Sequence, residues 1–203
     1  AMYQAKRAGK NQHAYYSLDL DKVVQRRADI ERALRENHFD DEFKLMYMPY
    51  LDTAGQKVIG VEVLLRWFSK ELGFVSPDEF IPIAEQTGLF DLVDKWVIKN
   101  AFASFHKVQD QFPHAIQLSI NLSSAELETI RLSEFIHQHA KANRIPPELI
   151  DFEITETFES ESQGFPLLHE LARLGYKLAI DDFGSGYTSI TQLVQYPVQK
   201  IKL

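Results

Sequence analysis

The stretch KLAIDDFGSGYTS, residues 177–189, is the most informative part of the sequence about the fold. A short apolar strand at 178–180 ends on two adjacent acids, Asp181 and Asp182, and a glycine-rich turn and a helix start follow. Carboxylates at a strand tip lose hydration as the strand enters a core, so they need water, a cation or a basic partner nearby. Taken alone, the pair has two equally good explanations. Either Asp182 caps the turn and Asp181 is simply exposed, or both acids belong to a functional site. Other strands decide between the two interpretations.

Strict alternation of polar and apolar residues predicts further strands, each with one polar face. They lie at residues 61–67, 116–121, 151–156 and 198–203. An open parallel sheet with helices on both sides would be apolar on both faces, so a barrel with a polar site at one mouth explains the pattern better. Strand and helix patterns alternate from residue 58 onward, which is typical of right-handed βα units.

The first strand is expected to run against the others. Residues 43–51 are predicted as a strand, and the short connection at 52–55 favours antiparallel pairing with the strand that begins at Val58. Five parallel strands follow, whereas a closed eight-stranded barrel usually takes about 250 residues. We therefore expect an α/β fold, a TIM-like (β/α)8 barrel with one antiparallel strand, that is incomplete at the C-terminus and folds poorly when residues 1–203 are expressed alone.

Three regions are expected along the chain. Residues 1–17 look like the tail of a preceding domain, residues 18–37 like a charged linker helix, and residues 38–203 form the partial barrel domain. The linker helix carries an apolar stripe of Val23, Ile30 and Leu34. A later helix is predicted to start with a capping box, in which Ser76 is the cap, Pro77 lies in the first turn, Glu79 reaches back, and Gly88 ends the helix.

Composition limits the classes of function. The net charge of -7 argues against a nucleic-acid-binding protein, and the absence of cysteine excludes disulfides and thiolate metal sites. No apolar run approaches the roughly 18 residues of a membrane span, and the start lacks the apolar core of a signal peptide. A cytoplasmic location is expected, unless upstream regions of the full-length protein anchor it to a membrane.

Polar residues gather at the C-terminal halves of consecutive strands. They are Glu62, Asn121, Glu153 and Asp181, with Asp182 adjacent. Carboxylates that converge on one barrel mouth repel one another unless cations intervene, and oxygen ligands with one amide suit Mg²⁺ or Mn²⁺. Two such metals could activate a water for in-line attack on phosphorus. For each residue alone a structural salt bridge is about as good an explanation, but the joint pattern favours a site.

Two basic residues complete the candidate site. Lys202, on the polar face of the last strand, could hold the attacking water or neutralise developing charge. Arg66 could hold a phosphate through its planar fork of donors.

Several short motifs between about Phe39 and Leu203 resemble those of the EAL-domain family, the cyclic di-GMP phosphodiesterases and their receptor relatives. They are YMP at 47–49, GVEVLLRW at 60–67, SP at 76–77 with EFIP at 79–82, NLS at 121–123, EITE at 153–156, DDFGSGY at 181–187, and Lys202. The family fold is a barrel with one antiparallel strand. Residues 1–11 look like the end of a GGDEF diguanylate cyclase-type domain, which commonly precedes an EAL domain.

The resemblance implies a phosphodiesterase that opens cyclic di-GMP to linear pGpG with Mg²⁺ or Mn²⁺. One metal would be bound by Glu62, Asn121, Glu153 and Asp181, and Asp182 would serve the second. Glu62, Asp181, Asp182 and Lys202 would form the catalytic group, with Lys202 assisting the water. The nucleotide would contact Tyr47, Leu65, Arg66 and Pro77. Tyr187 and its loop, residues 184–189, would couple the site to a homodimer interface.

Two departures from the family pattern leave alternatives open. The signature Glu-Ala-Leu is Glu62-Val63-Leu64 here, and Val63 is expected to point away from the polar face and spare the ligand. Met48 stands where the family usually has glutamine, which removes an amide near the nucleotide. The enzyme remains the leading hypothesis, and a receptor that binds cyclic di-GMP without cleaving it is the alternative. A purely structural barrel used for dimerisation explains the shared acidic face less well.

Overall fold

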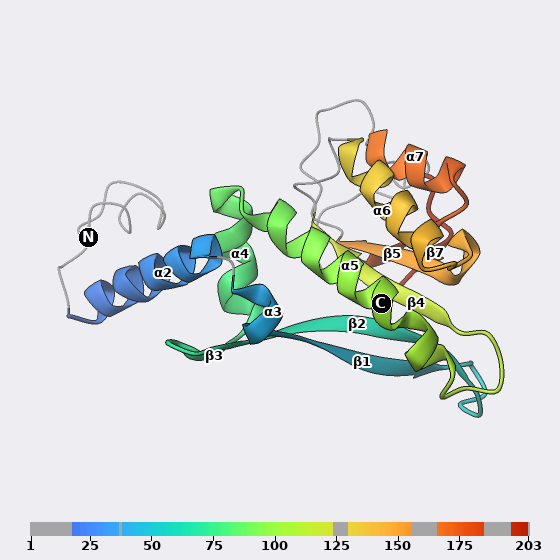
Figure 1. Cartoon of the computed structure of the whole chain (residues 1–203), viewed down its shortest axis with the longest axis horizontal. Helices are drawn as coiled ribbons and strands as arrows, with labels where there is room; N and C mark the ends of the chain where they lie inside the picture. The colour runs from blue at the N-terminus through green and yellow to red at the C-terminus, as the bar shows by residue number, and fades with distance from the viewer. Residues whose placement is uncertain (1–17, 37, 124–129, 156–165, 185–195, 203) are drawn as a thin grey trace.

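The computed structural model describes residues 18–36, 38–123, 130–155, 166–184 and 196–202 (Figure 1). Some predicted features fall outside these residues. They are the tail at 1–17, the helix start that follows the glycine-rich turn, Tyr187 with most of its loop, and Leu203.

Seven strands form one sheet. They are β1 (Phe43–Leu51), β2 (Val58–Ser69), β3 (Gly73–Val75), β4 (Gln117–Leu122), β5 (Ile150–Thr155), β6 (Lys177–Asp181) and β7 (Lys200–Ile201). The order is β1-β2-β4-β5-β6-β7, with β1 antiparallel to β2 and the later neighbours parallel. The predicted α/β fold of TIM-barrel type is confirmed, and over the described residues its sheet is open between β1 and β7.

Strand β3 was not predicted. It pairs antiparallel with the end of β2 through a tight hairpin, in which Ser69 lies opposite Gly73 and Gly73 adopts a left-handed φ of 71°. A glycine is suited to that position because other residues rarely adopt positive φ. The fold therefore has a second antiparallel strand, although β3 lies off the main path of the sheet.

The α-helices of the described residues are α2 (Leu18–Glu36), α3 (Phe39–Glu42), α4 (Pro77–Thr87), α5 (Phe90–Gln109), α6 (Arg131–Ala142) and α7 (Pro166–Arg173). Helices α2 and α4 lie where the sequence predicts them. Figure 1 shows α5, α6 and α7 side by side along one face of the sheet. No helix among the described residues is both long and apolar enough to cross a membrane.

The main core lies between the sheet and these helices. The apolar residues of each alternating strand face the helices and are nearly fully buried, namely Val61, Val63 and Trp67, Leu118 and Ile120, Phe152 and Ile154, and Leu178 and Ile180. Burial of each such side chain stabilises the fold by about 1.5–3 kcal/mol. The opposite face of the same strands carries the polar residues, as the alternation predicts.

Helix α2 is docked on the domain. Ile30 and Leu34 of its predicted stripe are fully buried, whereas Val23 remains 66% exposed. The Arg26 Nε–Glu79 Oε1 distance is 2.8 Å, and this ion pair joins α2 to α4. The helix predicted as a linker therefore packs its second half into the core.

The predicted capping box at the start of α4 is wrong in its side-chain contacts. Ser76 occupies the N-cap position and Pro77 the first turn, but the Ser76 side chain makes no capping hydrogen bond. Glu79 accepts hydrogen bonds from Arg26 of α2. Gly88 ends the helix in the left-handed region with a φ of 70°, as predicted.

Candidate active site

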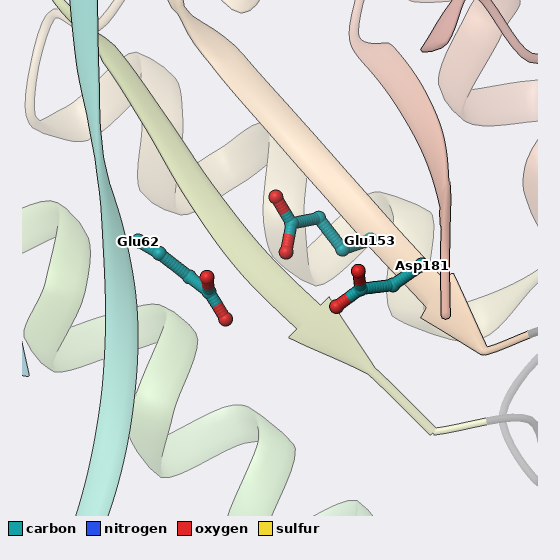
Figure 2. A group of neighbouring side chains, drawn as sticks. All are labelled: Glu62, Glu153 and Asp181. Atoms are coloured by element: carbon teal, nitrogen blue, oxygen red, sulfur yellow. The ribbon is translucent and has the colours of Figure 1, made fainter. Parts of the chain in front are cut away.

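Three carboxylates converge on the polar face of the sheet. Glu62 of β2, Glu153 of β5 and Asp181 of β6 each place one oxygen within 4.8 Å of the others. Figure 2 shows their side chains pointing toward one another across the intervening strand. Glu62 and Glu153 are buried, and Asp181 is half-buried. The predicted convergence of these acids on one face is present.

Parallel register brings these residues together. Asn121 of β4 lies opposite Glu153 of β5. Asp181 lies opposite Thr155 of β5, two residues beyond Ala179, which is the residue of β6 that pairs with Glu153. Residues two apart on a strand share a face, so each acid arrives on the inner side of its own strand. Sequence positions more than a hundred residues apart thus meet within one cluster.

An amide and an ammonium group join the carboxylates. The Asn121 amide nitrogen donates to Glu62 Oε1 at 2.9 Å. Lys202 Nζ lies 2.6 Å from Glu153 Oε2, 3.3 Å from Glu62 Oε2 and 3.6 Å from Asp181 Oδ2. The lysine therefore contacts every carboxylate of the cluster.

Burial and charge shift two ionisation equilibria in this cluster. Burial raises the pKa of Glu153, and its hydrogen bond to Lys202 only partly offsets this effect. Burial acts to lower the pKa of Lys202, but the hydrogen bond and attraction from Glu153, helped by Glu62 and Asp181, raise it above its usual value. Lys202 is therefore an ammonium at neutral pH, able to donate hydrogen bonds but not to accept a proton.

The donor set fits a hard divalent cation. Three carboxylates face one ammonium, so the cluster keeps an excess of negative charge that a divalent cation would balance. Carboxylate and amide oxygens are the ligands that Mg²⁺ and Mn²⁺ prefer. The acidic group can hold a metal by its chemistry as well as by its geometry.

The structure describes three other predicted site residues, of which Asp182 adjoins the cluster. Asp182 is exposed next to Asp181, with a left-handed φ of 53°, and its backbone N–H donates to Asp181 Oδ1 at 3.1 Å. Arg66 is half-buried, four residues beyond Glu62 on the same face of β2, and donates to the Leu65 carbonyl at 2.8 Å. Pro77 is half-buried at the start of α4.

Two predicted nucleotide contacts lie on the opposite face. The Tyr47 hydroxyl is hydrogen-bonded to Ser104 of α5, and Leu65 packs against the hydrophobic core. Successive residues of a strand point to opposite faces, and Tyr47 and Leu65 occupy positions of β1 and β2 that face the helices. The structure therefore does not bring them to the carboxylates. Val63 is 3% exposed on this same face, so the prediction that it points away from the site is confirmed.

Met48 stands directly across from Glu62 in the β1–β2 pair and is 51% exposed. Directly opposed residues of an antiparallel pair share a face. The thioether that replaces the usual amide of the family therefore borders the cluster.

Sequence reasoning gave no role to Tyr50 and Ser119. The Tyr50 hydroxyl lies 3.3 Å from Ser119 Oγ, and Ser119 also hydrogen-bonds Glu153. Tyr50 covers Gly60 so closely that a Cβ there would lie 2.1 Å from the hydroxyl. Tyr50 lies two residues after Met48 on β1, so the two side chains share a face of the sheet. This spacing is the sequence feature that could have placed Tyr50 near the cluster.

Comparison with known proteins identifies relatives of this chain. The chain is 65% identical over 202 residues to the biofilm architecture maintenance protein MbaA of Vibrio cholerae, covering 100% of this chain and 26% of that protein. It is 29% identical over 205 residues to the cyclic di-GMP phosphodiesterase NbdA of Pseudomonas aeruginosa, covering 100% of this chain and again 26% of the relative. The chain thus spans about a quarter of the length of these relatives.

A solved structure and a family model agree with these relatives. The chain superposes on a PaMucR phosphodiesterase–c-di-GMP complex with a TM-score of 0.77 at 27% identity, over 86% of this chain and 72% of that one. The family model described as EAL domain matches residues 27–203 and so includes the second half of α2. This match covers well over half of the sequence, and the chain belongs to the EAL-domain family.

Proposed function

We propose that the protein is a metal-dependent phosphodiesterase that hydrolyses cyclic di-GMP to linear pGpG in bacterial second-messenger signalling. The observation that carries the proposal is the convergence of Glu62, Glu153 and Asp181 within 4.8 Å on one face of the sheet, with Asp181 at the carboxyl end of β6 and Lys202 among them. In barrels of this kind the carboxyl-terminal face is where active sites are built. A cyclic di-GMP phosphodiesterase among the relatives supports this substrate.

The metals would be Mg²⁺ or Mn²⁺. Glu62, Asn121, Glu153 and Asp181 would hold one ion, and Asp182 would serve a second. When bound, such ions lower the pKa of a water and offset the negative charge of the phosphate.

The chain's own residues would bind and orient the reactants. Arg66 would pair its planar fork with a phosphate. Lys202, as a permanent ammonium, would hold the attacking water by a hydrogen bond and stabilise negative charge, rather than act as the base. Attack of the water oxygen on phosphorus breaks one P–O bond of the ring, and a proton ends on the released ribose oxygen. The product is linear pGpG.

A receptor that binds cyclic di-GMP without cleaving it is the second candidate. The observation that favours it is Met48, which borders Glu62 and offers no strong hydrogen bond where the family usually has an amide. Binding needs fewer correctly placed groups than hydrolysis does, so an altered neighbour can remove turnover and leave affinity.

Product analysis separates the two functions. The purified protein, mixed with cyclic di-GMP and Mg²⁺ or Mn²⁺, should yield pGpG on chromatography, and Glu62→Ala or excess chelator should abolish the product. Glu79→Ala is the matched control, because this carboxylate pairs with Arg26 of α2 rather than with the cluster. Binding by calorimetry without any product would establish the receptor. Undiminished turnover in Glu62→Ala would overturn the metal-dependent mechanism.

We also propose a cytoplasmic homodimer in which the domain follows a GGDEF-like domain, whose tail would be residues 1–17. The loop at 184–189 would connect the dimer interface to Asp181 and Asp182. Light scattering on the purified protein, with and without a Tyr187→Ala substitution, tests the dimer. A monomer in the unsubstituted protein at micromolar concentration would contradict it.

A further inference from the structure

A second polar layer lies beneath the carboxylate cluster, on the same inner face of the sheet. Lys200 of β7 donates hydrogen bonds to Asp151 of β5 and to Gln117 of β4. The Asp151 side chain is 2% exposed and the Lys200 side chain 36% exposed. This ion pair does not touch Glu62 or Asp181, so no step of the proposed reaction uses it directly.

The two layers form a matched pair of ion-pair rungs. Asp151 and Glu153 are two residues apart on β5, and Lys202, which directly follows β7, is two residues from Lys200 of β7. A spacing of two residues corresponds to about 6.6 Å along each strand. The upper rung is Glu153–Lys202 and the lower rung is Asp151–Lys200.

Both lysines reach β5 across an intervening strand. Ala179 of β6 pairs with Glu153 on one side and with Lys200 on the other, and it is fully buried. Because its side chain is a single methyl group, the inner surface of β6 leaves room for the lysine side chains to pass. A larger residue at this position would block the rungs.

Strand β7 and its flanking residues are attached to β6 mainly by backbone hydrogen bonds, in which the Gln199 and Lys202 N–H groups donate to the Leu178 and Ile180 carbonyls. Backbone bonds of this kind can form in more than one register, so the side chains must select one. The ladder between β7 and β6 consists of two residue pairs, Ala179 with Lys200 and Ile180 with Ile201, and Ile201 is 50% exposed. A slip of one residue would turn both lysines to the other face, and a slip of two would bring Lys202 to Asp151. The lower rung excludes both alternatives, because only the observed register pairs both lysines with both acids.

Stability alone does not account for a charge pair in which the carboxylate of Asp151 is buried. Replacement of such a pair by apolar residues of similar volume is often neutral or stabilising, whereas its geometry specifies one arrangement. We propose that Asp151 and Lys200 are positioning residues that set the register of β7 and thereby hold the Lys202 ammonium among the carboxylates. This inference rests on the proposed function for its catalytic consequence, but not for its structural one.

The structural consequence is tested by the chemical reactivity of Lys202. The variants are Asp151→Leu/Lys200→Met, which removes the rung without leaving an unpaired charge, and Lys200→Arg, which retains it. Limited acetylation with acetic anhydride, read by mass spectrometry against the exposed Lys107, measures how well Lys202 is held. We expect acetylation of Lys202 to rise about tenfold in the double variant, equivalent to one interaction of ~1.4 kcal/mol, and to stay unchanged in Lys200→Arg.

The catalytic consequence is tested by steady-state kinetics on the same variants with cyclic di-GMP. A displaced ammonium should lower kcat by about 10- to 100-fold while KM stays near its original value. Arg26→Met is the control, because it breaks an ion pair of the domain that lies outside the polar layers. Loss of kcat in that control to the same extent would show a general effect of stability and overturn the positioning role.

Failure of the positioning role of Asp151 and Lys200 can be distinguished from failure of the proposed phosphodiesterase activity. If the protein has no turnover, the acetylation measurement still decides the inference. If the double variant does not fold, Asp151→Asn/Lys200→Gln keeps a neutral hydrogen bond in the rung and should place Lys202 as the original pair does. A folded double variant with unchanged Lys202 reactivity and unchanged kcat would overturn the inference.

Discussion

Removal of the Lys202 ammonium should destabilise the metal-free protein. In Lys202→Met, Glu62, Glu153 and Asp181 would remain together without their cation, and the Glu153 side chain is 2% exposed. Removing one partner of a buried pair costs about 3–5 kcal/mol. Lys202 is itself 35% exposed, so solvent screening reduces this figure, and we expect a loss of roughly 2–3 kcal/mol in the free energy of unfolding.

A divalent metal should reverse this loss. Without the competing ammonium the carboxylates carry more uncompensated charge, so Mg²⁺ or Mn²⁺ should stabilise Lys202→Met more than it stabilises the original protein. Metal at about 100 times its dissociation constant contributes about 2.7 kcal/mol, enough to restore the stability of the variant. The loss of turnover should remain, since the metal does not replace the hydrogen-bond donor that orients the water.

Urea unfolding followed by circular dichroism at pH 7 measures both effects, in chelator and at saturating metal. Lys70→Met is the matched control, because the Lys70–Asp41 pair is 70% and 65% exposed and should contribute at most about 1 kcal/mol. Saturating metal should raise the free energy of unfolding of this control and of the original protein by the same amount. Equal stability of Lys202→Met and the original protein in chelator would refute the charge argument, and so would a destabilised variant that metal does not rescue.

Three further predictions follow from the same geometry. Arg66→Ala should weaken cyclic di-GMP binding by about 1.5–3 kcal/mol in calorimetry, and unchanged affinity would remove Arg66 from the site. Because burial raises the pKa of Glu153, its contribution to stability is present below its unfolded value of 4.5 and is lost as pH rises through the folded pKa. Glu153→Gln should therefore flatten the decline of metal-free stability above pH 4.5, and an unchanged urea-unfolding profile would contradict this assignment. Gly60→Ala should destabilise by about 1–3 kcal/mol through its clash with Tyr50, and a neutral effect in the same unfolding assay would show that Tyr50 moves freely.

Alternation predicted most of the cluster, because a period of two fixes the face of each residue on a strand. It placed Glu62, Asn121 and Glu153 on one side of the sheet, where the structure has them, and Asp181 was predicted from its position at the tip of an apolar strand. Leu65 was assigned to the apolar face by alternation and to the nucleotide by family resemblance. The structure agrees with the alternation, since Leu65 packs against the core.

Contacts with residues that are distant in the sequence could not be predicted from local patterns. Ser76 and Glu79 have the spacing of a capping box, but Glu79 is engaged by Arg26, a residue 53 positions away. A local pattern cannot reveal such a competitor. Strand β3 was not predicted for another reason. Its three residues are too few to show the alternation of polar and apolar side chains, and only Gly73 indicated a turn.

The polar contacts of β7 explain how so short a strand can be part of the site. The apolar residues that hold β2, β4, β5 and β6 in place face the helices, whereas Ile201 of β7 is half-exposed and contributes little to that core. Besides its backbone hydrogen bonds to β6, the strand is attached through the side chains of Lys200 and Lys202, and through the Gln199 side chain, which accepts the Leu178 N–H at 2.8 Å. For the Asp151–Lys200 pair, we expect the contact to specify geometry more than it adds stability. Substitutions in β7 should therefore change where Lys202 lies before they change whether the domain folds.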